Sequence, residues 1–328
     1  MSILISAVIC TYNRATYLKK AIQSLMAQNL KEEVYEILIV DNNSTDNTKK
    51  TVIEFSADVH NIHYIFEPIQ GLSKARNTGL AEAKGEYVAY LDDDAIAEPD
   101  WLESILSCFE AATSPLGCVG GKIDPIWEAP CPEWLPDNYL SYLTILDWGP
   151  EPILIDSKKY LAGANMAFPT DLLRKLGGFN VELGRQGKKL LSSEEVWLQE
   201  TIRRHSHDVY YDPSVVVKHH AAASRLVPDW FFQRLYWQGI SNAFLDLARD
   251  PAFVDRRTSV ILEYIKRLFT DLKDYIYFCL PVNHPHRFHR RCIKLQEIGY
   301  LWGLISLAKN IPSMPTEISS LREVTSLK

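Results

Sequence analysis

The stretch YVAYLDDD (residues 87–94) decides the fold class, because an apolar run of strand length ends in three consecutive aspartates. Three carboxylates this close together repel one another unless a cation compensates their charge. Alternate residues of an extended segment point to the same side, so Asp92 and Asp94 can share one target. Carboxylate oxygens favour Mg²⁺ or Mn²⁺, although an acidic loop before a helix would contain the same residues.

Strand-like and helix-like segments alternate through the first 120 residues, around this stretch. Short apolar runs bounded by polar residues occupy 3–9, 36–40 and 62–66. Apolar residues at helical spacing occupy 15–28, 47–55, 73–83 and 99–111. This order predicts an α/β fold, with a Rossmann-like, mostly parallel sheet flanked by helices. Ligands of such sheets bind at the carboxyl ends of the strands, where most polar motifs of this chain fall.

Beyond the first 120 residues, the regular alternation of strand-like and helix-like segments is interrupted. Residues 122–156 are rich in Pro and Trp and lack periodicity, so we expect a long, partly irregular surface segment. Strand-like and helix-like patterns return in 160–224, and the remainder is mainly helical, with candidate helices at 230–248 and 259–278. Trp127 and other aromatic residues of the middle segment could stack on sugar rings on an acceptor side, although buried packing is their commoner role.

The composition argues against several classes of protein. Of the 328 residues, 47% are hydrophobic, which is enough for a sizeable core. The six cysteines show no CxxC spacing, so a zinc knuckle or redox motif has no support. No apolar run reaches about 18 residues, and the first ten residues are typical of a strand rather than a signal peptide. We therefore expect a cytoplasmic protein with reduced thiols.

The net charge of −6 is unevenly distributed. Residues 225–328 contain 15 Lys and Arg against 10 Asp and Glu, so the preceding part is strongly acidic. An acidic body argues against broad nucleic-acid binding. The basic segment 284–291 and the apolar segment 298–308 could together rest on an anionic membrane surface. A helix pair packed on the body explains the same composition equally well.

Four motifs together resemble those of family 2 glycosyltransferases, which have the GT-A fold. They are AVICTYNR at 7–14, IVDNNSTD at 39–46, GLSKARN at 71–77 and the DxD signature at 92–94. Each motif is short, but all four occur in the family's order and at the ends of predicted elements. The resemblance covers residues 3–240.

The resemblance implies an inverting, metal-assisted transferase. It would move a sugar from a nucleotide-diphosphate sugar to a hydroxyl of a glycan or lipid-linked glycan, in polysaccharide biosynthesis, with Mn²⁺ or Mg²⁺ as cofactor. UDP, GDP and dTDP sugars all fit. The GT-A domain would span 1–224, with a nucleotide-binding half at 1–121 and an acceptor and catalytic half at 122–224. Residues 225–328 would form a mainly helical extension, which could lie peripherally at the inner face of the cell membrane.

The resemblance also implies roles for individual residues. Asp94 and His219 would hold the metal, and Asp41 would accept a hydrogen bond from the base. Nucleotide-sugar binding would involve a set of residues near the strand ends: Thr11, Tyr12, Asn13, Arg14, Asp41, Asn43, Arg76, Asp92 and Asp93. From residue type alone, Asn13 also suits a turn, Arg76 a surface salt bridge and His219 a structural role.

A second group of motifs contains the expected catalytic base. In similar enzymes the segment with Gly163 and Asn165 borders the acceptor and donor-sugar sites. Family members usually show Glu-Asp where this chain has Glu194 and Glu195, so Glu195 would replace the catalytic Asp, with Glu194 as the rival. A carboxylate within hydrogen-bonding reach can take the proton of an attacking sugar hydroxyl. Two acids in the first turn of a helix are also favoured by its dipole without any catalytic role.

Two other functions fit parts of this pattern. A sugar-nucleotide pyrophosphorylase has a related sheet, but residues 11–14 lack its Gly-rich basic phosphate loop. A catalytically degenerate protein of the same fold would bind sugar nucleotides or act as a scaffold, and it could lose its acids. The presence of both Asp92 and Asp94, of the Glu194–Glu195 pair and of His219 favours an enzyme.

Overall fold

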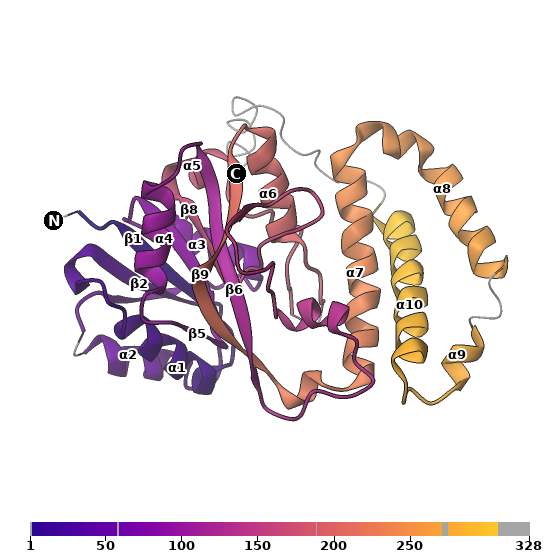
Figure 1. Cartoon of the computed structure of the whole chain (residues 1–328), viewed down its shortest axis with the longest axis horizontal. Helices are drawn as coiled ribbons and strands as arrows, with labels where there is room; N and C mark the ends of the chain where they lie inside the picture. The colour runs from indigo at the N-terminus through magenta and orange to yellow at the C-terminus, as the bar shows by residue number, and fades with distance from the viewer. Residues whose placement is uncertain (1, 58, 188, 271–274, 308–328) are drawn as a thin grey trace.

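The computed structural model describes residues 2–57, 59–187, 189–270 and 275–307. Within these residues, one sheet has the order β3-β2-β1-β4-β8-β6-β9-β5, with β7 paired to β9 (Figure 1). Its strands are β1 (Ile5–Thr11), β2 (Tyr35–Asp41), β3 (Ile62–Phe66), β4 (Tyr87–Asp92), β5 (Ala95–Ala97), β6 (Leu116–Trp127), β7 (Ile153–Leu154), β8 (Asn165–Pro169) and β9 (Asp208–Ala221). The α/β class predicted from the sequence is confirmed.

Helices follow or separate these strands. The α-helices of the sheet region are α1 (Ala15–Met26), α2 (Thr48–Ser56), α3 (Leu72–Glu82), α4 (Trp101–Glu110), α5 (Thr170–Lys175) and α6 (Glu194–Arg204). Those after it are α7 (Pro228–Arg249), α8 (Pro251–Thr270), α9 (Ile276–Cys279) and α10 (Pro285–Ser306). Short 3₁₀ helices are η1 (Glu32–Val34), η2 (Asp137–Leu143) and η3 (Ala223–Arg225). The expected boundary at residue 224 stays a prediction, and residues 308–328 of the expected extension lie outside the described residues.

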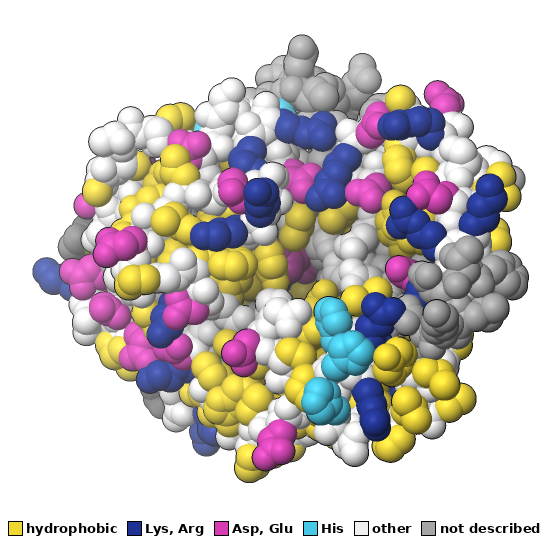
Figure 2. All heavy atoms as spheres, turned by 45° about the vertical axis from the view of Figure 1, so that its right-hand side comes forward, with side chains coloured by type: hydrophobic (Ala, Val, Ile, Leu, Met, Phe, Trp, Pro, Cys, Tyr) yellow, Lys and Arg dark blue, Asp and Glu magenta, His cyan; other side chains and the backbone are white. Residues whose placement is uncertain are grey.

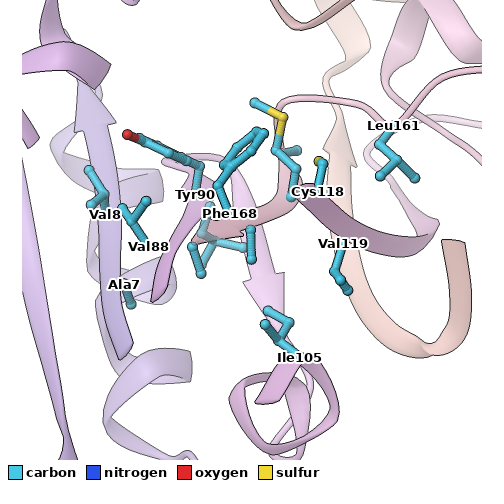
Figure 3. Close-up of a cluster of buried hydrophobic side chains, with 14 of the residues drawn as sticks. Ala7, Val8, Val88, Tyr90, Ile105, Cys118, Val119, Leu161 and Phe168 are labelled. Carbon is cyan, nitrogen blue, oxygen red and sulfur yellow. The ribbon is translucent and has the colours of Figure 1, made fainter. Parts of the chain in front are cut away.

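Strands β3, β2, β1 and β4 are parallel and form the half of the sheet nearest the N-terminus. β1 and β2 are buried along nearly their whole length, which explains why both are continuous apolar runs. Figure 3 shows how this core continues into the next half, with Val8 and Val88 on one side and Cys118 and Leu161 on the other. The register brings the carboxyl ends of β1, β2 and β4 to one edge, as expected for parallel strands.

The sheet changes direction directly after the acidic stretch. β4 ends at Asp92, and after two turn residues β5 pairs antiparallel with β9. In that pairing Ala95 lies opposite His219. A histidine that is far away in the sequence is therefore brought beside the aspartates by backbone hydrogen bonding.

The middle segment is more regular at its start than the sequence predicts. β6 runs to Trp127 and pairs in parallel with β9, so residues 122–127 are strand rather than irregular surface. A register shift between Gly121 and Ile123 interrupts the periodicity. A Cβ at Gly121 would overlap the carbonyl oxygens of Asp212 and Val215, so the bulge requires glycine. The glycine and Pro125, which are usual loop residues, hid this strand.

Helices α7 and α10 pack against each other at very short range beside the sheet region (Figure 1). A Cβ at Gly299 of α10 would overlap the carbonyl oxygen of Tyr236 on α7. A Cβ at Gly239 of α7 would overlap that of Gln296 on α10. Glycines on both helices thus let the two backbones touch. The expected helix at 230–248 is confirmed as α7, whereas the expected helix at 259–278 begins earlier, as α8 at Pro251.

The basic segment near the C-terminus contributes to a packed helix. Phe288 of α10 is buried against Trp134 and Phe231. Trp134, an aromatic residue of the middle segment, therefore has a packing role. Figure 2, which brings the C-terminal helices forward, shows basic and acidic side chains mixed over much of this face and histidines gathered in one place. None of the helices in the described part of the chain has the length and apolarity to cross a bilayer. Contact with a membrane surface stays a prediction.

The α7–α10 contact can be tested by Gly299→Ala. Alanine raises intrinsic helix propensity by about 1 kcal/mol, so a clash-free site would gain stability. We expect instead a loss of about 1–3 kcal/mol, because the added methyl group must push the two backbones apart. Thermal unfolding followed by circular dichroism measures the change. Ser306→Ala, at an exposed position of the same helix, is the control; a gain of stability in both variants would contradict the close contact.

Candidate active site

A cavity of about 520 Å³ lies at the carboxyl ends of β1 and β4. Its walls also include the segment before α6, the start of α6 and one face of α7. Eleven of the residues predicted from the sequence line it: Thr11, Tyr12, Arg14, Arg76, Asp92, Asp93, Asp94, Gly163, Glu194, Glu195 and His219. Segments that are up to about two hundred residues apart in the sequence therefore meet at one place.

Asp93 and Asp94 are buried and joined by one arginine. Nη1 of Arg14 donates to Asp93 Oδ1 at 3.0 Å and to Asp94 Oδ2 at 2.7 Å. Burial raises the pKa of Asp93 to about 6, although Arg14 opposes the rise. Burial also acts to raise the pKa of Asp94, but His219, Arg14 and Arg225 together hold it well below its usual range. Asp94 is thus the permanently ionised member of the pair.

Asp92, Asp94 and His219 form a group that could hold a metal ion. Each offers one ligand atom, and these atoms lie within 4.8 Å of one another. His219 Nε2 is 3.0 Å from Asp94 Oδ1. Asp93 is not in this group; its Oδ2 accepts from the Thr11 hydroxyl at 2.8 Å and its Oδ1 from Arg14. Asp92 and Asp94 have ligand atoms close together, as expected, although Asp93 and Asp94 form a turn rather than an extended segment. Two carboxylates with an imidazole fit Mn²⁺ or Mg²⁺.

Arg76 lies in the wall between the two acidic pairs. Its Nη1 donates to Glu194 Oε1 at 2.8 Å, and its Nη2 lies 3.5 Å from Asp92 Oδ1. The Arg76 side chain is only 3% exposed, so a surface salt bridge is the wrong description. A Cβ at Gly163 would overlap Nη2 of Arg76, and glycine is therefore needed to admit the guanidinium. Gly163 therefore supports the site because it has no side chain.

Glu194 and Glu195 begin α6 but have different surroundings. Oε1 of Glu194 accepts from Arg76, and Oε2 of both glutamates is buried with no hydrogen-bond partner among the described residues. Of these two described glutamates, only Glu194 forms an ion pair with Arg76. Burial and the neighbouring Glu194 raise the pKa of Glu195 to about 8, against the pull of Arg76. Glu195 is therefore the carboxyl group that a bound hydroxyl could engage.

Five of the predicted residues do not line the cavity. They are Asn13, Asp41, Asn43, Asn165 and Trp127. Oδ1 of Asn13 accepts from the backbone of Thr45 and Asp46 and so joins the loops after β1 and β2, while its positive φ of 54° is typical of a turn residue. Asn43 is exposed, and its positive φ of 68° marks a turn.

The other three have identifiable neighbours. Asp41 accepts from Ser44 N–H and from the Tyr64 hydroxyl, so both its oxygens are engaged. Asn165 is buried and joins Trp101 to the backbone, which uses its amide in packing. Trp127 is 37% exposed at the end of β6. Roles for these residues in substrate binding stay predictions.

Several arginines of the cavity were not predicted from the sequence as site residues. Arg225 is buried, and its Nη2 lies 3.2 Å from Asp94 Oδ2. Arg185 and Arg234 also line the cavity. Arg234 and Gln238 lie one turn apart on α7 and both face the cavity, between apolar core residues. Polar residues that interrupt an apolar helix face were therefore the feature of the sequence that could have identified Arg234 and Gln238.

Comparisons with known proteins agree with this arrangement. Residues 6–155 match the family model described as glycosyl transferase family 2. A curated relative, the glucosyl-dolichyl phosphate glucuronosyltransferase of Haloferax volcanii, is 28% identical over 255 residues, which cover 77% of this chain and 80% of that protein.

Two solved structures are similar to the chain in fold. The mannosyltransferase PcManGT from Pyrobaculum calidifontis, in complex with GDP-Man and Mn²⁺, is 17% identical with a TM-score of 0.57, covering 99% of this chain and 80% of that one. TarS 1–349 from S. aureus, in complex with UDP, is 17% identical with a TM-score of 0.54, covering 93% and 91%. At these identities the likeness shows the GT-A fold alone.

The buried ion pair between Arg76 and Glu194 gives a prediction about stability. Arg76→Gln should lower the free energy of unfolding by about 3–5 kcal/mol, because Glu194 would stay buried without its partner. Urea denaturation measures the loss. The double variant Arg76→Gln with Glu194→Gln contains neither charge, so it should recover about 1 kcal/mol or more of that loss. A double variant no more stable than Arg76→Gln would contradict this recovery, and the single variant Glu194→Gln completes the cycle that measures the coupling.

Proposed function

The chain carries a domain of glycosyl transferase family 2, and from this premise we propose that it transfers a sugar from a nucleotide-diphosphate sugar to a hydroxyl of a glycan or lipid-linked glycan. The observation that supports this most strongly is the shared cavity. It combines an Asp-Asp-His group with a carboxyl group, that of Glu195, whose Oε2 has no described hydrogen-bond partner. One group suits the departing diphosphate and the other an attacking hydroxyl.

On the donor side, Asp92, Asp94 and His219 would hold Mn²⁺ or Mg²⁺. Such an ion neutralises the negative charge that a nucleotide diphosphate develops as it leaves. Arg14 and Arg225 both donate to Oδ2 of Asp94, and His219 lies beside its Oδ1, so the carboxylate is oriented before any ligand binds. Although burial opposes it, His219 and the two arginines hold the pKa of Asp94 well below its usual range and keep it ionised, as a ligand of a cation must be.

On the acceptor side, Glu195 would act as the general base. The acceptor hydroxyl oxygen forms a bond to the anomeric carbon, its proton passes to Glu195, and the bond from that carbon to the diphosphate oxygen breaks. Attack opposite the leaving group inverts the anomeric centre. Glu194 is the weaker candidate because its Oε1 is held by Arg76 at 2.8 Å, which leaves only its Oε2 without a partner. We assign Glu194 the role of positioning Arg76 and the start of α6.

The donor and acceptor classes follow from the relatives only as proposals. The neighbours of similar fold were solved with GDP-Man and with UDP, so nucleotides of both kinds are candidates. The H. volcanii relative is a glucosyl-dolichyl phosphate glucuronosyltransferase, which supports a lipid-linked acceptor here. Such acceptors occur in polysaccharide assembly at membrane surfaces. A degenerate binding protein of the same fold is the alternative.

Nucleotide binding should depend on metal and on Asp94. We expect Mn²⁺ together with one of UDP, GDP and dTDP to raise the melting temperature, since a ligand at about 100 times its Kd stabilises the native state by about 2.7 kcal/mol. EDTA should abolish the rise. Asp94→Asn, which keeps the shape of the side chain, should show no metal-dependent rise, with Arg256→Gln on α8 as the matched control. No rise with any of the three nucleotides would count against the proposed donor.

Transfer should depend on the ionisation of Glu195. Its raised pKa, about 8, means that most of the base is protonated at neutral pH. The kcat/KM should therefore rise about tenfold per pH unit up to pH 8 and then level off, because this parameter reports the free enzyme. Glu195→Gln should lower kcat by about 10²–10⁴-fold and leave nucleotide binding intact. Nucleotide binding without any transfer in the wild type, across glycan and lipid-linked acceptors, would favour the degenerate protein.

A further inference from the structure

Two arginines of the cavity, Arg185 and Arg234, have no carboxylate partner among the residues that the structure describes. Nη1 of Arg234 is buried and makes no hydrogen bond. Its guanidinium lies over the ring of Tyr142, with Cζ 5.4 Å from the ring centroid. The ring supplies a modest attraction but does not neutralise a full charge. The backbone carbonyl of Arg185 accepts from Leu72 N–H, which fixes that segment to the start of α3.

The other three arginines of the cavity are neutralised. Arg14 is paired with Asp93 and Asp94, and Arg76 with Glu194 and Asp92, while Arg225 is paired with Asp94. Burial lowers the pKa of Arg234 against the pull of Tyr142 and Glu195, and burial together with Arg234 lowers the pKa of Arg185. A buried guanidinium nitrogen without a partner, as at Arg234, is costly, and a bound anion would remove that cost.

The position of Arg234 separates it from the donor machinery. Arg234 feels the charges of Tyr142, Glu195 and Tyr160, whereas Arg225 and Arg14 surround Asp94. Arg185 lies between these groups, since it is affected by both Arg234 and Arg14. The proposed diphosphate site already contains the group of Asp92, Asp94 and His219, together with Arg14 and Arg225. The extra positive charge therefore lies beside the proposed base, where the acceptor must bind.

We propose that Arg234, with Arg185, binds an anionic oxygen group of the acceptor, a phosphate or a carboxylate, next to Glu195. A guanidinium presents two parallel N–H donors that match such a group. The inference rests on the proposed function, because only a transferase has an acceptor. It narrows the acceptor class to sugars that carry a negative charge close to the reacting hydroxyl.

The test uses the full chain, with Mn²⁺ and the nucleotide identified above at saturation so that the donor side is filled. Isothermal titration calorimetry compares glucose 1-phosphate, glucuronate and uncharged glucose. We expect one of the two anionic sugars to bind at least about tenfold more tightly than glucose, since a charge-assisted hydrogen bond contributes that much. Arg234→Gln should abolish the difference, whereas Arg256→Gln should leave it unchanged.

Several outcomes would overturn the inference. Equal binding of all three sugars, or no measurable binding of either anion, would remove the charged acceptor. An equal loss of nucleotide and anionic-sugar affinity in Arg234→Gln would reassign this arginine to the donor. If Arg234→Gln does not fold, Arg185→Gln should show the same loss of preference. Failure of the proposed function looks different, because then the wild type binds no nucleotide in the first place.

Discussion

Charge compensation inside one cavity is the constraint on which the rest of the structure depends. Asp93, Asp94 and Glu194 are buried, and carboxylates in such a place are tolerated only with cations beside them. Arg14 follows the end of β1 and Arg76 lies on α3, and each forms ion pairs with two carboxylates. The order of the strands and helices brings these charged partners, which are far apart in the sequence, into one cavity.

Backbone pairing and side-chain pairing reinforce each other in this arrangement. The turn after β4 places Asp94 beside His219, which the pairing of β5 with β9 brings to the same position. Gly163 leaves the space in which the Arg76 guanidinium reaches Glu194. Because Arg76 has two partners and Asp94 has three, the acids are oriented before any ligand enters. Such preorganisation is what transfer chemistry requires of groups that act on developing charge.

The sequence predicted the parts of this site that are encoded locally. The α/β order and the acidic end of β4 follow from periodicity and residue type, and the metal group followed from the alternation of Asp92 and Asp94. The choice between Glu194 and Glu195 could not be made, because it depends on Arg76 reaching one of them across 118 residues of sequence. Arg225 and Arg234 were not assigned to the site, since their acidic or cavity neighbours come from distant parts of the chain; for Arg234 only the interrupted apolar face of α7 pointed to it. β6 was missed because its bulge glycine has the signature of a loop.

The close approach of α7 and α10 has a consequence for how such a protein can diversify. Glu195, His219 and Arg234 all lie beyond residue 155, where the family match ends. The cavity is thus built by two stretches of chain, and α7, which carries Arg234 in the later one, packs against α10. Under the proposed function, His219 belongs to the donor side although it comes from the later stretch. Substitutions on the cavity face of α7 can therefore alter the proposed acceptor site while the proposed metal ligands stay unchanged.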